Sequence, residues 1–343
     1  MESKSEAIDA VIAWVDGNDP KLNAKRAQYI QSKITVREDV GGTARFSNIG
    51  EIYWCVASIN KFAPWFRKIY IITDGQDPKI DEHLPKGSDI NHIPVEIVDH
   101  KVIFKDYEEY LPVFNSLAIE TMMWRIPGLS EKFIYFNDDF LLANPVTPSD
   151  FFTPDGLPIA RGYRHSTFTA WFLREMNYIS KLGKSKVKFR DTMVQAATTV
   201  KGKALVWFVR VHHTPHALVK SQFERFFKHH PHAFINNISY KFRNRAQLLP
   251  IEVIYLYAIN KLGAPLEDMR QSLVYFDAKN PSETFKERFK KLIHDRQVKF
   301  ICINSFERFT PNAQRLLAEW FNKRLGMKLA IPDENKDNAL ESK

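Results

Sequence analysis

Short apolar runs alternate with segments of helical periodicity over the first 140 residues of the chain. Four runs have the length and composition of buried strands, and each has an aspartate at its carboxyl end: 8–15 (IDAVIAWV, before Asp16), 68–75 (KIYIITDG), 95–100 (VEIVDH) and 132–139 (KFIYFNDD). Between them, Ile52, Val56 and Ile59 recur at helical spacing before Pro64, and 116–126 predicts a second helix before Pro127. Strands that alternate with helices predict a parallel-rich α/β sheet.

The second half of the chain has mainly helical periodicity. Helices are expected over 216–229 and 251–262, at 280–283 (Asn280 as N-cap, Pro281 at the first position, Glu283 completing a capping box) and over 310–325, with Thr310 and Pro311 at the start. Residues 299–304 (KFICIN) predict a late strand, and the lysine-rich segment 181–190 predicts an exposed loop or edge strand.

The expected fold is therefore α/β, with a parallel-rich mixed sheet flanked by helices (Rossmann-like or glycosyltransferase-A-like) and a mostly helical second half. The expected organisation is an α/β half over residues 1–150, a helical and basic half over 151–331, and a frayed polar tail over 332–343.

Charge is divided unevenly between the two halves, at −7 for residues 1–150 and +16 for 151–343. This division suits a divalent cation bound together with a polyanionic ligand, although basic residues on solvated faces would give the same numbers. No apolar run approaches the roughly 18–20 residues of a membrane span, and the first ten residues do not form a signal peptide. The two cysteines, Cys55 and Cys302, favour a reducing cytosol over a disulfide framework.

Asn137, Asp138 and Asp139 follow an apolar strand, where two unpaired carboxylates would cost several kcal/mol if they were buried. Carboxylate and amide oxygens are ligands that Mg²⁺ prefers, with Mn²⁺ as the alternative ion. A turn or a helix cap would also use such residues. The carboxyl ends of parallel strands form one edge where ligands bind, so Asp16-Gly17, Asp74 and the Asp138-Asp139 pair are expected along that edge.

Histidines and arginines in the second half supply further candidates. Six histidines lie between 212 and 232; His213 and His216 lack the cysteine or HExxH context of a zinc site, and one of the six could act as a general base. Guanidinium groups suited to phosphate are found at Arg243, Arg245 and Arg45, unless these are solvated. Asn115-Ser116 at a helix start could hold an anion or simply cap the helix.

Taken together, five ordered blocks resemble the conserved blocks of the Stealth family of sugar-1-phosphate transferases, which includes bacterial capsular polysaccharide phosphotransferases. The blocks are IDAVIAWVDGNDP, ARFSNIGEIYWCVASINKFAPWFRKIYIITDGQDP, LPVFNSLAIETMMWRIPGLSEKFIYFNDDFLL, HHTPHALVKSQF and FICIN, from about residue 8 to residue 307. The resemblance implies a UDP-hexose or UDP-N-acetylhexosamine donor, transfer of the sugar 1-phosphate to a glycan hydroxyl, and release of UMP.

The resemblance also implies roles for individual residues. Asp138, Asp139 and Asn304 would bind Mg²⁺, His213 of the HTPH block would be the base, and Arg243 would bind phosphate. Asp16, Gly17, Arg45, Asp74, Asn115, Ser116 and His216 would contact substrate. Two departures from the family pattern are Asn304-Ser305, where the family often has Asn-Asp, and Asn48, where it usually has Asp.

In this interpretation residues 1–150 bind the nucleotide sugar and the metal, and 151–331 complete the active site and bind the acceptor, an oligosaccharide or phosphodiester-linked glycan, lipid-linked or free. The expected location is cytoplasmic, at the inner face of the membrane, with peripheral contact through 311–325 as an alternative to core packing. A conventional UDP-sugar glycosyltransferase, which releases UDP, is the main alternative function. A non-catalytic binder of nucleic acid or anionic glycan is the other, but no nucleic-acid motif is present.

Overall fold

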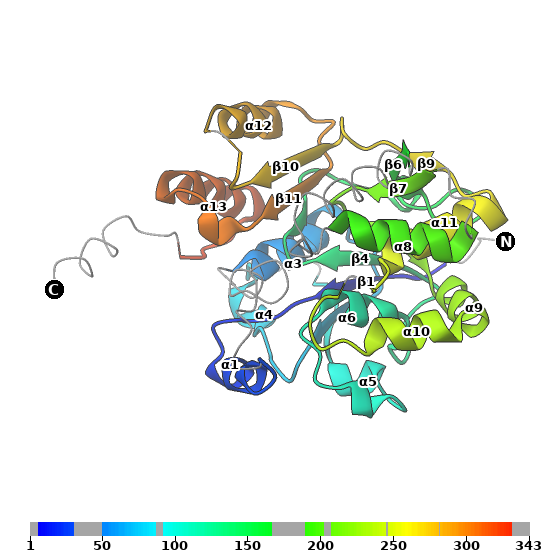
Figure 1. Ribbon diagram of the computed structural model, residues 1–343. Helices are drawn as coiled ribbons and strands as arrows, with labels where there is room; N and C mark the ends of the chain where they lie inside the picture. The colour runs from blue at the N-terminus through cyan, green and yellow to red at the C-terminus, as the bar shows by residue number, and fades with distance from the viewer. Residues whose placement is uncertain are drawn as a thin grey trace, which may run out of the picture.

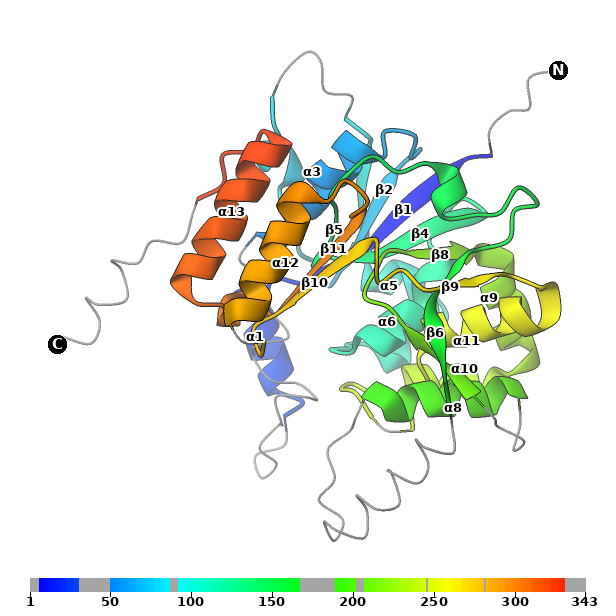
Figure 2. The ribbon, with the colours of Figure 1, turned by 90° about the horizontal axis from the view of Figure 1, so that it is seen from above.

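A computed structural model of the chain describes residues 6–30, 50–86, 92–166, 189–201, 207–244, 246–280 and 282–330. Its central sheet has the strand order β3-β2-β1-β4-β8. Four of these strands run parallel: β1 (Ile8–Ala13), β2 (Ile69–Thr73), β3 (Val95–Asp99) and β4 (Lys132–Asn137). The fifth, β8 (His216–Val219), pairs antiparallel with β4; Figure 1 shows β1 and β4 in the middle of the fold, and Figure 2 shows β8 beside β4.

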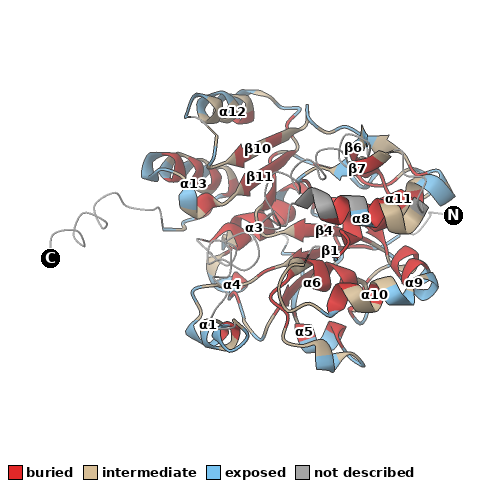
Figure 3. Ribbon diagram, in the orientation of Figure 1, coloured by how far each residue is buried: buried red, intermediate tan, exposed pale blue. Residues whose placement is uncertain are grey.

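Alternating side chains of the central strands pack into two cores, one on each face of the sheet. Ile12 and Ile71 face α3 (Glu51–Phe62), while Val11 and Tyr70 face α6 (Ser116–Met122). Both faces are therefore covered, which explains why β1 and β4 consist of almost continuous apolar residues (Figure 3). The remaining helices on the N-terminal side are short: α1 (Pro20–Ala27), α4 (Ile80–His83) and α5 (His100–Ile103).

Two smaller sheets extend the fold. The first has the order β10 (Leu273–Asp277), β11 (Phe300–Asn304) and β5 (Phe140–Leu142), and α12 (Ser282–His294) and α13 (Pro311–Leu325) lie over it (Figure 2). The second has the order β7 (Trp207–Val211), β6 (Ala160–Ser166) and β9 (Leu266–Glu267).

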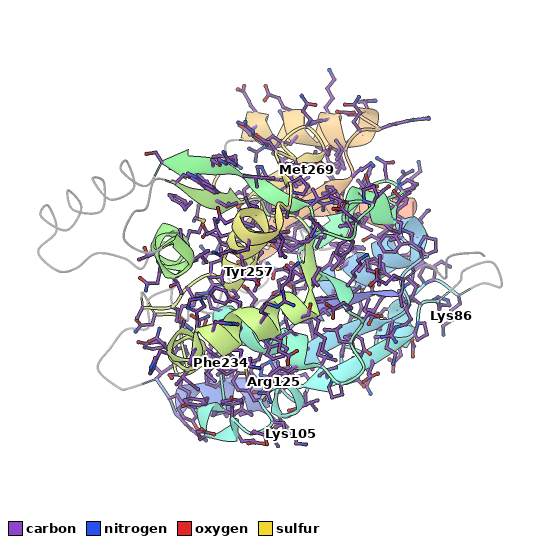
Figure 4. All side chains as sticks on the ribbon, turned by 90° about the vertical axis from the view of Figure 1, so that its right-hand side faces the viewer. Lys86, Lys105, Arg125, Phe234, Tyr257 and Met269 are labelled. Carbon is purple, nitrogen blue, oxygen red and sulfur yellow. The ribbon has the colours of Figure 1, made fainter. Side chains whose placement is uncertain are left out.

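The remaining helices gather near β8 and the third sheet. They are α8 (Phe189–Lys201), α9 (Lys220–His229), α10 (Pro231–Ile238) and α11 (Pro250–Tyr257), which continues as a π-helical turn to Leu262. Phe234 of α10 contacts the ring of Tyr107 at 5.2 Å between centroids, and Arg125 lies over the same ring at 4.9 Å (Figure 4). These contacts join the second half of the chain to the segments on either side of α6.

The predicted fold class is confirmed. All four parallel strands, the two helices between them, the late strand and the closing helix capped by Thr310 lie where the pattern places them. The expected helix over 216–229 is wrong in its first four residues, which form β8. Ala217, Leu218 and Val219 are a short apolar run that pairs with β4 and completes that edge, so the helix begins only at Lys220.

The expectations for segment 181–190, the tail, the division at residue 150 and the closing helix are tested only in part. Segment 181–188 and the tail lie outside the described residues, and 189–190 begin α8 rather than a loop or strand. Strands of both halves share sheets, since β8 pairs with β4 and β11 with β5, so the division at residue 150 stays a prediction about roles. In α13, Leu317 and Phe321 pack into the core. None of the described helices combines the length and apolar character needed to cross a bilayer.

An ion pair with a buried carboxylate holds the starts of the central strands together, and it generates a stability prediction. Asp9 is fully buried and accepts hydrogen bonds from Arg67 Nε at 2.8 Å, Arg67 Nη2 at 2.6 Å and Ser130 N at 2.7 Å. The Arg67 side chain is 44% exposed, so water can reach the carboxylate when the guanidinium is removed. Replacing Arg67→Ala should therefore lower the free energy of unfolding by about 1–3 kcal/mol.

The measurement is denaturant unfolding, with Lys68→Ala as the matched control. Lys68 forms an exposed pair with Glu96 at 2.8 Å, and exposed pairs contribute little to stability. Equal effects of the two substitutions would contradict the role assigned to the Asp9–Arg67 pair.

Candidate active site

The carboxyl ends of β1, β4 and β11 meet at the turn formed by Asp138 and Asp139, here called the twin aspartates. Strand β4 ends at Asn137, where it lies beside Ala13, the end of β1. The order β3-β2-β1-β4 reverses direction along the sequence between these two strands, and such a switch point opens a crevice for ligands.

The second sheet arrives at the same turn from the other side. Strand β5 leaves directly after the twin aspartates and pairs antiparallel with β11, and Ile303 N donates to the carbonyl oxygen of Asp139 at 3.1 Å. Asn304, the expected metal ligand at the end of β11, therefore comes next to the turn. Its register partner on β10 is Asp277, so a further carboxylate lies beside it.

Electrostatics at the twin aspartates favour a cation. Burial raises the pKa of Asp138 well above its usual range, and the charges of Asp139 and Glu51 raise it further. Burial, with a smaller contribution from Glu51, raises the pKa of Asp139 to about 7, although the Cys302 thiol donates to Asp139 Oδ2 at 3.5 Å. Asp139 Oδ1 is buried and accepts no hydrogen bond from the part of the chain described.

These residues fit a hard divalent cation. An uncompensated carboxylate pair with an orphaned oxygen, next to an asparagine amide, is a donor set of the kind Mg²⁺ takes, with water and phosphate oxygens as further ligands. Among the described residues, no three His, Cys, Asp or Glu side chains lie close enough together to hold a metal ion by themselves. His213 and His216 therefore do not belong to a zinc site of that kind. A two-carboxylate site that is completed by substrate matches both observations.

Arg243 belongs to a polar network near Tyr135, on the strand that leads to the twin aspartates. Its Nη2 donates to Ser116 Oγ at 2.5 Å, and the Glu120 carboxylate lies close enough to oppose the lowering of the Arg243 pKa by burial. Burial raises the pKa of Glu120 to about 7, against the effects of Arg243 and Ser116. Tyr135, which feels the charges of Glu120, Arg243 and the twin aspartates, donates to Asn137 Oδ1 at 2.7 Å.

Asn115 and Ser116 have different roles. Asn115 Oδ1 accepts from Leu117 N at 3.1 Å, and its amide nitrogen donates to Gln247 Oε1 at 2.8 Å, so capping is the structural role of Asn115. Ser116 orients Arg243. Contact of either residue with substrate stays a prediction.

The two histidines of the HTPH block differ in access. His213 is exposed, stacks on the Tyr275 ring at 4.9 Å between centroids and meets the edge of Phe140, the residue after the twin aspartates. Surrounding protein, together with His212 and Arg210, lowers the pKa of His213 to about 4, while Asp277 opposes this shift. The imidazole is thus neutral at pH 7 and open to a substrate.

His216 is buried, and its Nδ1 forms a hydrogen bond with the Tyr255 hydroxyl at 3.1 Å. Burial and the nearby Arg161 lower its pKa well below the usual range. A direct contact between His216 and substrate is therefore not favoured by its position; it supports the strand that carries the HTPH block.

The loops after β1 and β2 are tied together at the same edge. Gln76 Oε1 accepts from Asp16 N at 2.9 Å, and Gln76 Nε2 donates to Asp16 O at 2.9 Å. Gly17 O accepts from Asn23 Nδ2 at 2.7 Å. The Asp74 carboxylate is already paired with Lys25 at 2.7 Å, so in this arrangement it is not free for a ligand. Arg45, Asn48 and Arg245 lie outside the described residues.

Several neighbours of the site were not among the sequence candidates. They are Lys25, Glu51, Glu120, Tyr135, Tyr275 and Asp277. Asp277 could have been found, because LVYFD is one more apolar run that ends in aspartate. The others lie within elements and carry no local signal of their position.

The raised pKa of Asp139 predicts a pH-dependent effect of Asp139→Asn. An unfolded chain ionises this group near pH 4 and the folded chain near pH 7, so the folded state loses stability as pH rises between these values. Without divalent cations, Asp139→Asn should raise the thermal midpoint by a few degrees at pH 8 and by much less at pH 5.

Scanning fluorimetry in chelator at the two pH values measures this difference, with the exposed Asp81→Asn as the control. A lower midpoint at pH 8, or the same shift at both pH values, would contradict the charge assigned to Asp139.

Comparison with known proteins adds the family. Residues 6–33 match the family description Stealth protein CR1, conserved region 1, and residues 45–160 match Stealth protein CR2, conserved region 2. Among solved structures, the galactosyltransferase LgtC in complex with donor and acceptor sugar analogues superposes with a TM-score of 0.43 at 12% identity, over 96% of this chain and 99% of LgtC, a likeness too weak to bear on function.

Two relatives of known name are similar to this chain over long segments. The chain is 44% identical to the receptor polysaccharide phosphotransferase WefC of Streptococcus gordonii over 45% of its own length and 43% of WefC. It is 31% identical to the exopolysaccharide phosphotransferase SCO6021 of Streptomyces coelicolor over 92% of its length and 54% of SCO6021. It thus spans about half of these relatives.

The exopolysaccharide phosphotransferase cps2G of Lactiplantibacillus plantarum is matched over most of both proteins. The identity is 34%, over 69% of this chain and 71% of cps2G. The chain therefore belongs to the Stealth family.

Proposed function

We propose that this protein transfers hexose 1-phosphate or N-acetylhexosamine 1-phosphate from a UDP-sugar to a glycan hydroxyl, forming a phosphodiester and releasing UMP. The observation that carries the proposal is a pair of carboxylates at the switch point of the sheet, with the neutral, exposed ring of His213 against Phe140 beside them. The half-buried Arg243 lies near Tyr135, on the strand that leads to the same turn. The relatives named capsular or exopolysaccharide phosphotransferases support the same reaction class.

His213 is the proposed general base. Its ring is neutral at pH 7, exposed, and held by stacking on Tyr275, whose hydroxyl donates to Asp277 Oδ2 at 3.3 Å. In the proposed step the acceptor oxygen attacks the β-phosphorus that bears the sugar, and its proton passes to His213. The new P–O bond forms as the bond between the β-phosphorus and the oxygen of UMP breaks, so the anomeric C–O bond stays intact.

Arg243 is the proposed ligand of the phosphoryl oxygens. Ser116 and Glu120 hold the guanidinium inside protein, where it needs little reorganisation to stabilise negative charge. Asp138, Asp139 and Asn304 would hold Mg²⁺ or Mn²⁺, which when bound supplies neutralisation of the diphosphate charge. Ser305 cannot supply the carboxylate that the family often has at this position, but Asp277, beside Asn304, brings another carboxylate to the same region.

The conventional glycosyltransferase reaction uses the same kinds of groups, and it differs in the bond that breaks. It would attack the anomeric carbon and release UDP instead of UMP. The identity of the donor, the identity of the acceptor and the expected cytoplasmic location stay predictions.

One incubation separates the two reactions. The protein is mixed with a panel of UDP-sugars, Mg²⁺ and oligosaccharides, and the nucleotide released is identified by anion-exchange chromatography, while the product linkage is read from its ³¹P NMR signal. UMP with a phosphodiester signal is expected. UDP with a glycoside product would replace the proposal by the glycosyltransferase alternative.

Substitutions at the site should lower the rate of this reaction. Asp138→Asn and Arg243→Lys should each lower kcat by about 10²–10³, because Asp138→Asn removes a carboxylate charge and Arg243→Lys replaces the planar guanidinium fork by a single ammonium group. His213→Ala should lower it by about 10²–10⁴ through loss of the base. Steady-state kinetics measure these effects.

Matched controls replace exposed residues of the same type. Asp81→Asn, Arg225→Lys and His229→Ala lie on α4 and α9 and should leave kcat within a factor of about 2. Site variants that retain the rate of their controls would contradict the assigned roles.

A further inference from the structure

A cavity of about 480 Å³ lies between β6 and the segment that leads from α11 into β9 and beyond it. Here it is called the Tyr163 pocket, and it is lined by Gly162, Tyr163 and Arg164 on β6 and by Ile259, Pro265 and Asp268 opposite. In Figure 4, Tyr257 marks the end of α11, and Met269 marks the residue after Asp268. A volume of this size falls in the range of small-ligand sites.

The β6 edge that faces this pocket lacks a long pairing. Strand β9 pairs with β6 only at Ala160 and Arg161, and within the described chain the β9 side of β6 has no further paired strand from Gly162 onward. Backbone N–H and C=O groups on such an edge can bond to hydroxyl groups of a ligand.

Cations surround the aromatic wall of the pocket. The guanidinium carbons of Arg270 and Arg210 lie 5.5 and 5.9 Å from the centroid of the Tyr163 ring. Arg164 follows Tyr163 on β6, so its side chain points to the other face of the strand, where it lies over Trp207 at 4.6 Å. The acidic groups here are Asp268, which pairs with Arg270 at 2.5 Å, and the exposed Glu267. Arg210 is exposed and forms no ion pair with the described residues, so its guanidinium is available to an anion.

The pocket adjoins the proposed base. Asp268 Oδ1 lies 3.1 Å from Nε2 of His212, whose ring is 5.6 Å from the Tyr163 ring. His212 directly precedes His213, and His213 meets Phe140 next to the twin aspartates. A continuous set of contacts therefore leads from the twin aspartates through His213 to the Tyr163 pocket, in the order donor, base and acceptor.

We propose that the Tyr163 pocket is the acceptor subsite and that it takes a glycan carrying a phosphodiester, the kind of linkage that the proposed reaction makes. The role of this pocket as an acceptor site rests on the proposed function. The apolar face of a pyranose suits the Tyr163 ring, sugar hydroxyls suit Asp268 and the β6 edge, and the phosphodiester suits Arg210 and Arg270.

A binding measurement tests the pocket without requiring turnover. The probe is a disaccharide whose two hexoses are joined by a phosphodiester, compared with the same hexoses joined by a glycosidic bond and with inorganic phosphate. Titration by NMR should give at least about tenfold tighter binding of the phosphodiester than of either comparison compound. Equal binding of the phosphodiester and the neutral disaccharide would overturn the proposal.

Two substitutions locate the binding. Arg270→Gln should remove most of the preference for the phosphodiester, and Tyr163→Ala should weaken binding of both disaccharides about tenfold. Arg225→Gln on α9 is the matched control, and thermal midpoints check that each variant is folded. Unchanged affinities in folded Arg270→Gln and Tyr163→Ala would place the acceptor elsewhere.

A kinetic measurement separates this inference from the proposed function. If UMP and a phosphodiester form in the UDP-sugar assay, Arg270→Gln should raise KM for the phosphodiester acceptor about tenfold and leave KM for the donor within a factor of about 2. An unchanged acceptor KM in an active protein would refute the pocket alone, whereas release of UDP would refute the proposed function.

Discussion

Two carboxylates held side by side at the meeting point of two sheets are the constraint on which the rest of this structure depends. Burial raises the pKa values of Asp138 and Asp139, Glu51 raises both further, and the charge of Asp139 also raises the pKa of Asp138. A chain selected for stability alone would replace such a pair by neutral residues. Retaining it makes sense where a cation and a charged substrate complete the site.

The fold explains why the pair lies at this place. Strand order reverses between β1 and β4, and open α/β sheets bind ligands at the carboxyl ends of strands where this happens, while β5 turns away from β4 to join β11. That turn brings Asn304 and Asp277 from the far end of the chain to residues 138–139. β8 brings the HTPH block to the other side of β4, so that the imidazole comes from a third segment.

The sequence pattern predicted the elements of this arrangement that form from neighbouring residues. The four parallel strands, the closing helix and the aspartates at strand ends follow from apolar periodicity and from the position of polar residues. β8 was missed because three apolar residues before a helix do not distinguish a strand from the first helical turn, and only the pairing with β4 shows that they form a strand. Asp74 is paired with Lys25 and Asn115 caps α6, which only tertiary contacts reveal. Glu120 acts through Arg243, which lies more than 100 residues later in the chain, and Tyr275 acts through His213, which lies more than 60 residues earlier. No local signal in the sequence could indicate either pairing.

Direct observation of a divalent ion at the twin aspartates tests the central claim most directly. Titration of the protein with Mn²⁺ in the presence of UDP, followed by the electron paramagnetic resonance signal of the free ion, measures affinity and stoichiometry. The account predicts one site per chain, weakened by more than an order of magnitude when both Asp138→Asn and Asp139→Asn are introduced together. Equally tight binding of Mn²⁺ by the folded double variant would contradict it.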